Sequence, residues 1–341
     1  MKGYQFEDTQ GTFHLKKAEN ISYLYFPIAG EAGLKSSFTP NLGGDAKIDQ
    51  NTFLLEPVSA ENLVNNRNSR NFWCNVKGIG SWSLTGHSAE ELSKKFTEMQ
   101  DDSEVTAGFM WQKTTRESKK YQLRGEILSF IPVDKNVEIM LVTITNTGRM
   151  AQTVTPTAAI PLYGRSADNI RDHRHVTSLL HRIETTDTGV LVTPTLSFDE
   201  RGHQVNHMTY YCVGWSGNGE KPVDFYPTAE DFVGEGGNFE RPYAIVKNAE
   251  GVKAGTKIEG LEAVGGLHFS EITLEPEEEC SYLIFTGITE DIQEIRNLSK
   301  TYTTREKVLE ELEKTKAYWQ EKVNVAYHTG DSDFNQFMQW V

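Results

Sequence analysis

The chain has 341 residues, of which 34 are basic and 48 acidic, so its formal net charge is −14. A field of this sign repels polyphosphates and anionic lipid headgroups, which excludes nucleic acid and membrane as expected partners. Cys74, Cys212 and Cys280 lie far apart and form no Cys-x-x-Cys pair, so neither a disulfide framework nor a cysteine-rich zinc site is predicted. The first residues lack the apolar run of a secretion signal, and no later run is long enough to span a membrane. We therefore expect a cytoplasmic protein.

From residue 1 to about residue 290, short runs rich in Val, Ile, Thr, Tyr and Phe alternate with clusters of Gly, Asn and Asp. Such runs predict strands separated by turns, and their number predicts packed antiparallel sheets in one large, mainly β domain. The clearest predicted strands are Ile21 to Ile28, Thr106 to Lys113, Tyr121 to Ile131, Val137 to Asn146, Val154 to Tyr163, Val190 to Phe198, Met208 to Trp215, Leu267 to Leu274 and Ser281 to Ile288.

Glycines mark the turns and loops of this region. Residues 72–84 read as a β-hairpin, because Gly78 and Gly80 supply the positive φ angles that a tight turn needs. Residues 234–237 and 251–255 are glycine-rich and predict loops. Long loops on a rigid β scaffold often carry function.

One helix is expected within the β region. Ser88 and Glu91 have the spacing of a capping box, and the apolar residues that follow share one helical face, which predicts a short amphipathic helix over residues 89–99. The apolar residues of this face are Leu92, Phe96 and Met99.

After about residue 289 the pattern becomes helical. Thr303 and Glu306 form a second capping box, and apolar residues at three- and four-residue steps predict a helix of about 20 residues. The same spacing returns in residues 331–341, where the chain ends before this helix could, so we expect the chain to be part of something larger. The two apolar faces consist of Val308, Leu312, Thr315, Trp319 and Val323, and of Phe334, Phe337, Met338 and Val341.

The densest polar segment is Tyr163 to Arg182, which contains four Arg, three His and two Asp. Arginine and aspartate at this density can be buried only when each is paired, so the segment is either an internal ion-pair brace or a polar recognition surface. The candidate substrate-binding residues are Arg165, Asp168, Asn169, Arg171, Asp172, His173, Arg174 and His175.

Histidines and tryptophans offer weaker functional signals. A metal ion could gather several imidazoles, but the neighbouring arginines disfavour a dication, so no metal site is predicted. Acid/base work on a sugar needs a histidine and a carboxylate in contact, and the spacing selects no such pair. The tryptophans could stack on pyranose rings, although core positions are expected more often in a β sandwich. These residues are His173, His175, His203 and His207, the carboxylates Glu271 and Glu278, and Trp73, Trp82, Trp111 and Trp215.

Several motifs together resemble the N-terminal part of glycoside hydrolase family 94 phosphorylases, most closely the 1,2-β-oligoglucan phosphorylases. The resemblance covers essentially the whole chain and is most specific in the Arg165 motif. The motifs are Tyr23-Leu-Tyr-Phe-Pro-Ile-Ala-Gly-Glu-Ala-Gly33, Gln50-Asn-Thr-Phe-Leu54, Ser69-Arg-Asn-Phe-Trp73, Gly80-Ser-Trp-Ser-Leu-Thr-Gly86 and Arg165-Ser-Ala-Asp-Asn-Ile-Arg-Asp-His-Arg-His-Val-Thr-Ser-Leu-Leu180.

This resemblance implies a β-supersandwich domain, of the galactose-mutarotase-like type, over residues 1–290. It also implies a helical linker over residues 291–330 and the first helix of an (α/α)6 barrel over residues 331–341. In that family one acidic residue protonates the glycosidic oxygen while inorganic phosphate, the co-substrate, attacks the anomeric carbon and releases α-glucose 1-phosphate. No metal or other cofactor is implied. The general acid and the phosphate-binding residues lie in the barrel, so no catalytic residue is assigned here and the chain is expected to be inactive alone.

The implied partners are a β-1,2-linked glucooligosaccharide, the barrel domain and a second copy of the chain in a homodimer. Two alternatives stay open, a stand-alone carbohydrate-binding module and an aldose-mutarotase-like domain in which a histidine and a glutamate open the sugar ring. Mutarotation of fresh α-glucose would favour the aldose-mutarotase-like domain, and glucan binding without turnover would favour the carbohydrate-binding module.

Overall fold

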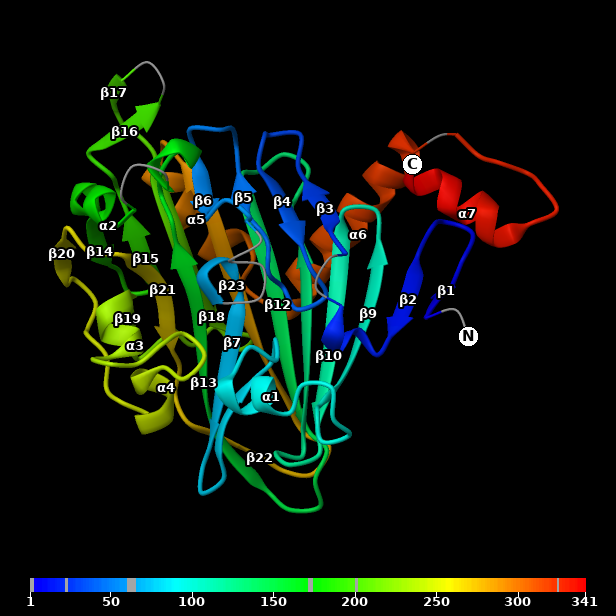
Figure 1. Cartoon of the computed structure of the whole chain (residues 1–341), viewed down its shortest axis with the longest axis horizontal. Helices are drawn as coiled ribbons and strands as arrows, with labels where there is room; N and C mark the ends of the chain where they lie inside the picture. Colours follow the sequence, from blue (N-terminus) through cyan, green and yellow to red (C-terminus); the bar gives the residue numbers. More distant parts are fainter. Residues whose placement is uncertain (1–2, 22–23, 60–65, 171–173, 200–201, 324) are drawn as a thin grey trace.

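The computed structural model describes residues 3–21, 24–59, 66–170, 174–199, 202–323 and 325–341. Within these residues, two large antiparallel sheets pack face to face, and two helices run along the outer side of the larger sheet (Figure 1). The prediction of a mainly β sandwich with C-terminal helices is confirmed.

The larger sheet has eleven strands among the described residues, and the smaller has six. In spatial order the larger sheet consists of β1 (Tyr4–Phe6), β2 (Phe13–Lys16), β9 (Asp102–Gly108), β10 (Trp111–Ser118), β11 (Leu123–Phe130), β12 (Val137–Asn146), β23 (Glu279–Thr289), β18 (Thr209–Ser216), β15 (Gly189–Val192), β14 (Arg182–Thr185) and β20 (Lys257–Glu259). The smaller sheet consists of β19 (Asp224–Thr228), β21 (Ala263–His268), β13 (Gln152–Leu162), β7 (Asn71–Val76) and β8 (Gly80–Ser83), with β22 (Ile272–Leu274) paired to β13.

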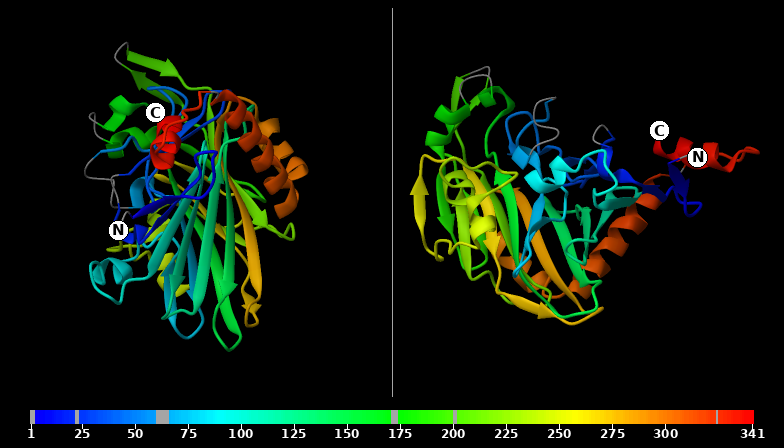
Figure 2. Two further views of the ribbon diagram at one scale, coloured as in Figure 1. Left: turned by 90° about the vertical axis from the view of Figure 1, so that its right-hand side faces the viewer. Right: turned by 60° about the horizontal axis from the view of Figure 1, so that its bottom comes forward.

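Two smaller sheets complete the β structure of the described chain. A four-stranded sheet joins β3 (Phe26–Ala29), β4 (Lys35–Phe38), β5 (Ala46–Lys47) and β6 (Phe53–Leu55), and a hairpin joins β16 (Leu196–Asp199) to β17 (Gly202–Val205). Figure 2 shows the strong curvature of the large sheets from two further directions.

The main core lies between the two large sheets. From β12, Met140, Val142 and Ile144 face it, and from β13 Ala158 and Ile160 meet them from the opposite side. The intervening residues of β12 face the other way, where helices cover the sheet. Because both faces of β12 are buried, its sequence is a nearly continuous apolar run instead of an alternating one.

A second core lies between the larger sheet and helices α5 (Ile292–Thr301) and α6 (Arg305–Lys322). Leu298 and Leu312 from the helices pack with Phe285 from β23, and the indole of Trp215 donates to the carbonyl of Tyr302 at 3.0 Å. The predicted long helix is confirmed, although its N-cap is Thr304 and not Thr303. No helix among the described residues has both the length and the apolar character needed to cross a bilayer.

A buried ion pair joins the residue before β7 of the smaller sheet to β12 of the larger sheet, beside the four-stranded sheet. Arg70 donates from Nε to Oε1 of Glu138 at 2.6 Å and from Nη2 to Oε2 at 3.0 Å, and both side chains are 0% exposed. Ser36 on β4 donates to the same carboxylate at 2.7 Å. The remaining guanidinium protons are directed to the carbonyl oxygens of Ser37, Gly44 and Asp45. The pair is therefore fully hydrogen-bonded, as a buried charge requires.

The helix predicted over residues 89–99 is shorter in the structure. Ser88 is the N-cap as expected, because its Oγ accepts from the amide of Glu91 at 3.1 Å, but the Glu91 carboxylate accepts from the Asp101 amide and α1 spans only Ala89–Ser93. Phe96 has a left-handed φ of 67°, which ends the helical path, and the side chains of Phe96 and Met99 are exposed. The prediction that they pack on one helical face was wrong.

The predicted strands failed where a turn interrupts an apolar run. The strand predicted from Thr106 to Lys113 contains the turn between β9 and β10, in which Met110 has a φ of 64°. Those predicted from Val190 to Phe198 and from Leu267 to Leu274 are each two strands, and of Ile21 to Ile28 only the end belongs to β3, with residues 22–23 outside the described chain. The other predicted strands, and the hairpin of residues 72–84 with its two positive-φ glycines, are confirmed.

The last helix, α7 (Ser332–Trp340), contacts the hairpin of β1 and β2. Its Trp340 lies against Phe13 and donates from Nε1 to the carbonyl of Gly11 at 2.8 Å, while Gln336 accepts from the Gly11 amide at 2.9 Å. The contact is therefore made by a glutamine and a tryptophan that the predicted apolar face did not include. Of that predicted face, Phe334, Phe337 and Val341 are exposed.

Candidate functional site

The polar segment after β13 is folded into short helical turns, η3 (Ala167–Ile170), α2 (Arg174–Thr177) and η4 (Ser178–Leu180). Arg165, which is 1% exposed, donates to the carbonyl of Tyr163 at 2.9 Å, to Thr177 Oγ1 at 2.9 Å and to Glu262 Oε2 at 2.7 Å. Its guanidinium also lies over the ring of Tyr163, 4.4 Å from the centroid. The arginine thus links three parts of the chain from the inside.

The other candidate residues divide into three groups. Asn169 is buried, and its Oδ1 accepts from the amide and the hydroxyl of Ser166 at 3.1 and 2.9 Å, whereas Asp168 is half-buried. Arg165 and Asn169 are engaged inside the protein, which favours the brace interpretation for these two. Arg171, Asp172 and His173 lie outside the described residues, and Arg174 and His175 are described only as backbone of α2.

His181, at the end of this segment, is fully buried. Its ring nitrogens lie 3.1 Å from the carbonyl oxygens of Leu261 and Tyr163. Burial, followed by the nearby Arg165 guanidinium, lowers the pKa of His181 to about 4. The ring is therefore neutral at physiological pH and can donate to one of these carbonyls, which is a structural role.

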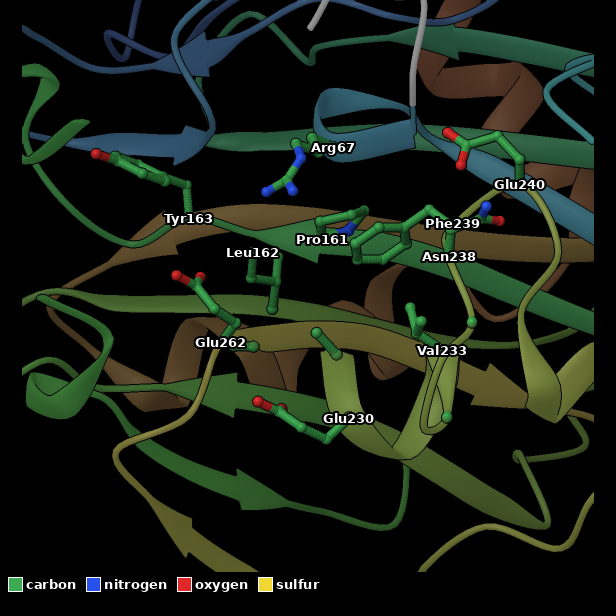
Figure 3. Close-up of a pocket in the computed structure, with 14 residues that line it drawn as sticks. Arg67, Pro161, Leu162, Tyr163, Glu230, Val233, Asn238, Phe239, Glu240 and Glu262 are labelled. Atoms are coloured by element: carbon green, nitrogen blue, oxygen red, sulfur yellow. The ribbon is translucent and has the colours of Figure 1, made fainter. Parts of the chain in front are cut away.

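A pocket of about 440 Å³ lies beside the Arg165 brace, on the outer face of the smaller sheet. We call it the β13–α3 pocket, because its floor is the end of β13 and one wall is α3 (Ala229–Val233). The loop after α3 and the residues before β21 close it, and Arg67 from η2 (Asn66–Asn68) reaches its edge. Figure 3 shows Pro161, Leu162 and Phe239 near its middle, with Glu230, Glu240 and Glu262 around them.

Tight packing fixes the wall of this pocket. Thr228 caps α3 by accepting from the amide of Asp231 at 3.1 Å. Gly237 then approaches the end of the helix so closely that a Cβ atom there would lie 2.2 Å from the carbonyl oxygen of Val233. Below, Phe232 packs with Trp73 in a small apolar cluster on the outer face of the sheet. The pocket is thus preformed by packed elements.

The polar residues of this pocket belong to no motif of the sequence. Glu230, Glu240 and Glu262 are single carboxylates in three separate segments, and Arg67 follows residues that carried no motif. The available signal was the glycine-rich loop of residues 234–237, which was predicted as a loop and lines the pocket.

The histidines give no metal site in the described chain. No group of three or more His, Cys, Asp or Glu able to hold a metal ion occurs among the described residues. His203 and His207 are exposed, and His203 contacts Phe198 within the β16–β17 hairpin. Glu271 forms a surface ion pair with Lys77 at 3.2 Å.

The tryptophans are mostly structural. Trp73, Trp82 and Trp215 are buried, as expected for a β sandwich. Trp111 is half-buried beneath the ammonium group of Lys316, which lies 4.5 Å from its ring centroid. Sugar stacking on the three buried indoles would require the core to open.

The family model described as "Glycosyl hydrolase 94, supersandwich domain" matches residues 55–305, well over half of the chain. The match includes both large sheets' central strands, the Arg165 brace and the β13–α3 pocket. No curated protein matches the chain.

Among solved structures, the chain is similar to a bacterial glucoamylase complexed with acarbose, with 10% identity, a TM-score of 0.46 and coverage of 98% of this chain and 40% of that chain. It is also similar to a putative kojibiose phosphorylase from the human microbiome, with 9% identity, a TM-score of 0.47 and coverage of 98% and 41%. A third similar structure is a putative aldose 1-epimerase from Escherichia coli K12, with 9% identity, a TM-score of 0.40 and coverage of 78% and 99%. The chain spans less than half the length of the first two, and likenesses this distant carry no information about a ligand.

Proposed function

This chain belongs to the glycosyl hydrolase 94 supersandwich-domain family, and from that premise we propose that it is the N-terminal domain of a glycoside phosphorylase acting on β-1,2-linked glucooligosaccharides. The single observation that carries the proposal is the family match over residues 55–305. The preference for β-1,2 linkages rests on the motif resemblance, above all in the Arg165 segment.

Phosphorolysis by inversion needs a carboxylic acid that can protonate the leaving oxygen while phosphate attacks. In the described residues, Glu91 is the carboxyl group whose pKa is raised, chiefly by burial and then by Asp101. Its Oε1 accepts from the Asp101 amide at 2.6 Å, and its side chain is 7% exposed, so it cannot reach a glycosidic bond. The family resemblance implies that the general acid lies in a barrel domain, and we assign the reaction to that domain.

The C-terminal helices fit the role of a connection to such a domain. Helices α5 and α6 are fixed to the larger sheet by the second core, whereas α7 contacts the β1–β2 hairpin through Gln336, Gln339 and Trp340. We propose that residues 291–330 form the linker and that residues 331–341 begin the barrel, where Phe334 and Phe337 find their apolar partners.

The decisive experiment compares two proteins. The 341-residue chain, incubated with β-1,2-glucooligosaccharides and phosphate, is expected to release no glucose 1-phosphate, whereas the same chain continued by a barrel domain releases it. Release by the short chain that survives repurification would refute the assignment of the reaction to a further domain. Preference of the longer protein for β-1,4-linked substrates would refute the linkage assignment alone.

The aldose-mutarotase alternative gains no support from the buried His–carboxylate pair of the described residues. The buried His–carboxylate pair is His268 with Asp224, whose Nδ1 and Oδ1 atoms lie 2.7 Å apart on the smaller sheet. His268 is only 8% exposed, so a sugar cannot reach its other nitrogen without rearrangement. Optical rotation of fresh α-glucose, with and without the chain, tests this alternative directly.

A further inference from the structure

We propose that the β13–α3 pocket is an accessory site that binds the uncharged hexose units of an oligosaccharide and rejects sugar phosphates. The proposal rests on the proposed function for its choice of glucan, but its geometry is independent of where phosphorolysis occurs. It gives this domain a binding role of its own.

The shape of the pocket suits a small part of a carbohydrate chain. Its volume of about 440 Å³ lies in the range of small-molecule sites. The apolar surface comes from Pro161, Leu162 and Phe239, and the half-buried ring of Phe239 can lie against the C–H face of a pyranose. Because the floor is a strand end and the wall is a capped helix, little has to be ordered on binding.

The polar groups of the pocket match hydroxyl donors. Glu230, Glu240 and Glu262 offer carboxylate oxygens, which only accept hydrogen bonds, and Asn238 offers both a donor and an acceptor. Sugar hydroxyls can donate to these carboxylates, and hydrogen bonds to charged acceptors are stronger than neutral ones. One of the carboxylates, Glu262, is held in place by Arg165 at 2.7 Å.

The same charges disfavour an anionic ligand. Three carboxylates face the pocket and Arg67 is its one cationic lining residue in the described chain. The nearby Arg165 is 1% exposed and forms an ion pair with Glu262, so these two charges largely cancel, and Glu230 and Glu240 outweigh Arg67 by one negative charge. The net charge of −14 adds to the repulsion. A phosphorylase needs phosphate at its reacting centre, so this pocket is a separate, glycan-holding site.

A second hollow extends the site. Glu240 also lines a neighbouring pocket of about 440 Å³, together with Ser81, Glu90 and Arg241. The segment between the two hollows is fixed, because the Glu240 carbonyl accepts from the Ala89 amide at the start of α1 at 2.7 Å. A chain of several sugar units therefore has room on both sides of Glu240.

Calorimetric titration of the 341-residue chain with β-1,2-linked glucotriose, and with β-1,4-linked glucotriose, tests this proposal. We expect binding of the β-1,2 compound that excess glucose 1-phosphate or inorganic phosphate does not displace. Phe239→Ala should weaken binding about tenfold or more, because the pyranose face loses the apolar surface on which it packs. Glu240→Gln, which keeps the shape of the side chain, should weaken binding several-fold, and the distant surface variant Glu271→Gln should bind like the parent.

Three results would overturn the proposal. The first is that neither glucotriose binds, and the second is that glucose 1-phosphate displaces the bound glucotriose. The third is that the single variants Glu240→Gln and Phe239→Ala both bind it with the affinity of the parent. Unfolding midpoints of the variants separate lost binding from lost folding. If the longer protein lacks phosphorolysis, the proposed function fails while binding here is unaffected, and if this chain lacks binding, the accessory site fails while phosphorolysis stands.

Discussion

Replacing Glu138 with alanine removes the carboxylate that holds the guanidinium of Arg70 in two short hydrogen bonds. Both side chains are 0% exposed, so the remaining charge cannot reach water unless the sandwich opens. Removing one partner of a buried ion pair costs about 3–5 kcal/mol, within a total stability of about 5–15 kcal/mol for a typical domain. We expect Glu138→Ala to lower the free energy of unfolding by about 4 kcal/mol, because Ser36 and the surrounding carbonyls cannot neutralise the arginine.

Urea unfolding followed by fluorescence of the buried tryptophans measures this change, with the slope of the transition checked for each variant. The matched control is Glu271→Ala, which removes one partner of the Lys77–Glu271 pair on the surface, where the side chains are 70% and 49% exposed. It should change stability by less than about 1 kcal/mol. The double variant Arg70→Met, Glu138→Leu should recover most of the loss, since it leaves no buried charge.

A loss in Glu138→Ala no larger than that in Glu271→Ala, at an unchanged slope, would refute this reasoning. It would mean that water reaches Arg70 in the folded protein. A double variant as unstable as Glu138→Ala would also count against it, because the cost would then come from lost packing and not from an unpaired charge.

Three further predictions concern the brace, acid stability and the last helix. Arg165→Met should lower the free energy of unfolding by about 2–3 kcal/mol, as measured by urea titration, because it removes hydrogen bonds that include one to the Glu262 carboxylate. Burial is the main cause that lowers the pKa of His181 to about 4 and that of His87 to about 3. Protonation therefore favours the unfolded chain, whose histidines have the ordinary pKa of 6.5, and the urea midpoint should fall as the pH decreases from 6.5 toward 4 and below. A midpoint that is flat over this range would contradict the neutral buried state. Trp340→Ala should speed proteolysis within residues 331–341 without changing the main unfolding transition, and equal digestion rates would show that the indole does not hold α7.

Most of the fold could be predicted because its signals are local. β-Branched and apolar residues predict strands such as β12, and two glycines predict the turn of the β7–β8 hairpin. The failures occur where a distant contact decides the local path. Past Ser93 the chain has good helical residues, but Glu91 accepts from the Asp101 amide and Phe96 takes a left-handed conformation, so the helix ends. A single sequence contains no signal for such a contact.

The site was harder to predict for the same reason. The Arg165 segment stood out by composition, yet the partner of its buried arginine, Glu262, lies 97 residues away. The partner of Arg70 lies 68 residues away. Pairing at this distance follows from how the sheets are wound, and an isolated glutamate in a loop carries no mark of it.

The brace and the pocket share Glu262, which joins the two interpretations of the polar segment. Arg165 is directed inward and contributes no charge to the pocket, but its hydrogen bond fixes the carboxylate that lines the pocket. Among the described residues of the segment, Arg165 therefore acts on the pocket through the carboxylate that it positions, and Tyr163 lines the pocket directly. A change at Arg165 alters both stability and the geometry of the site, whereas a change at the exposed Glu230, which lines the same pocket, alters the site alone. Measuring stability and ligand affinity for one variant at Arg165 and one at Glu230 therefore separates the bracing role from ligand recognition.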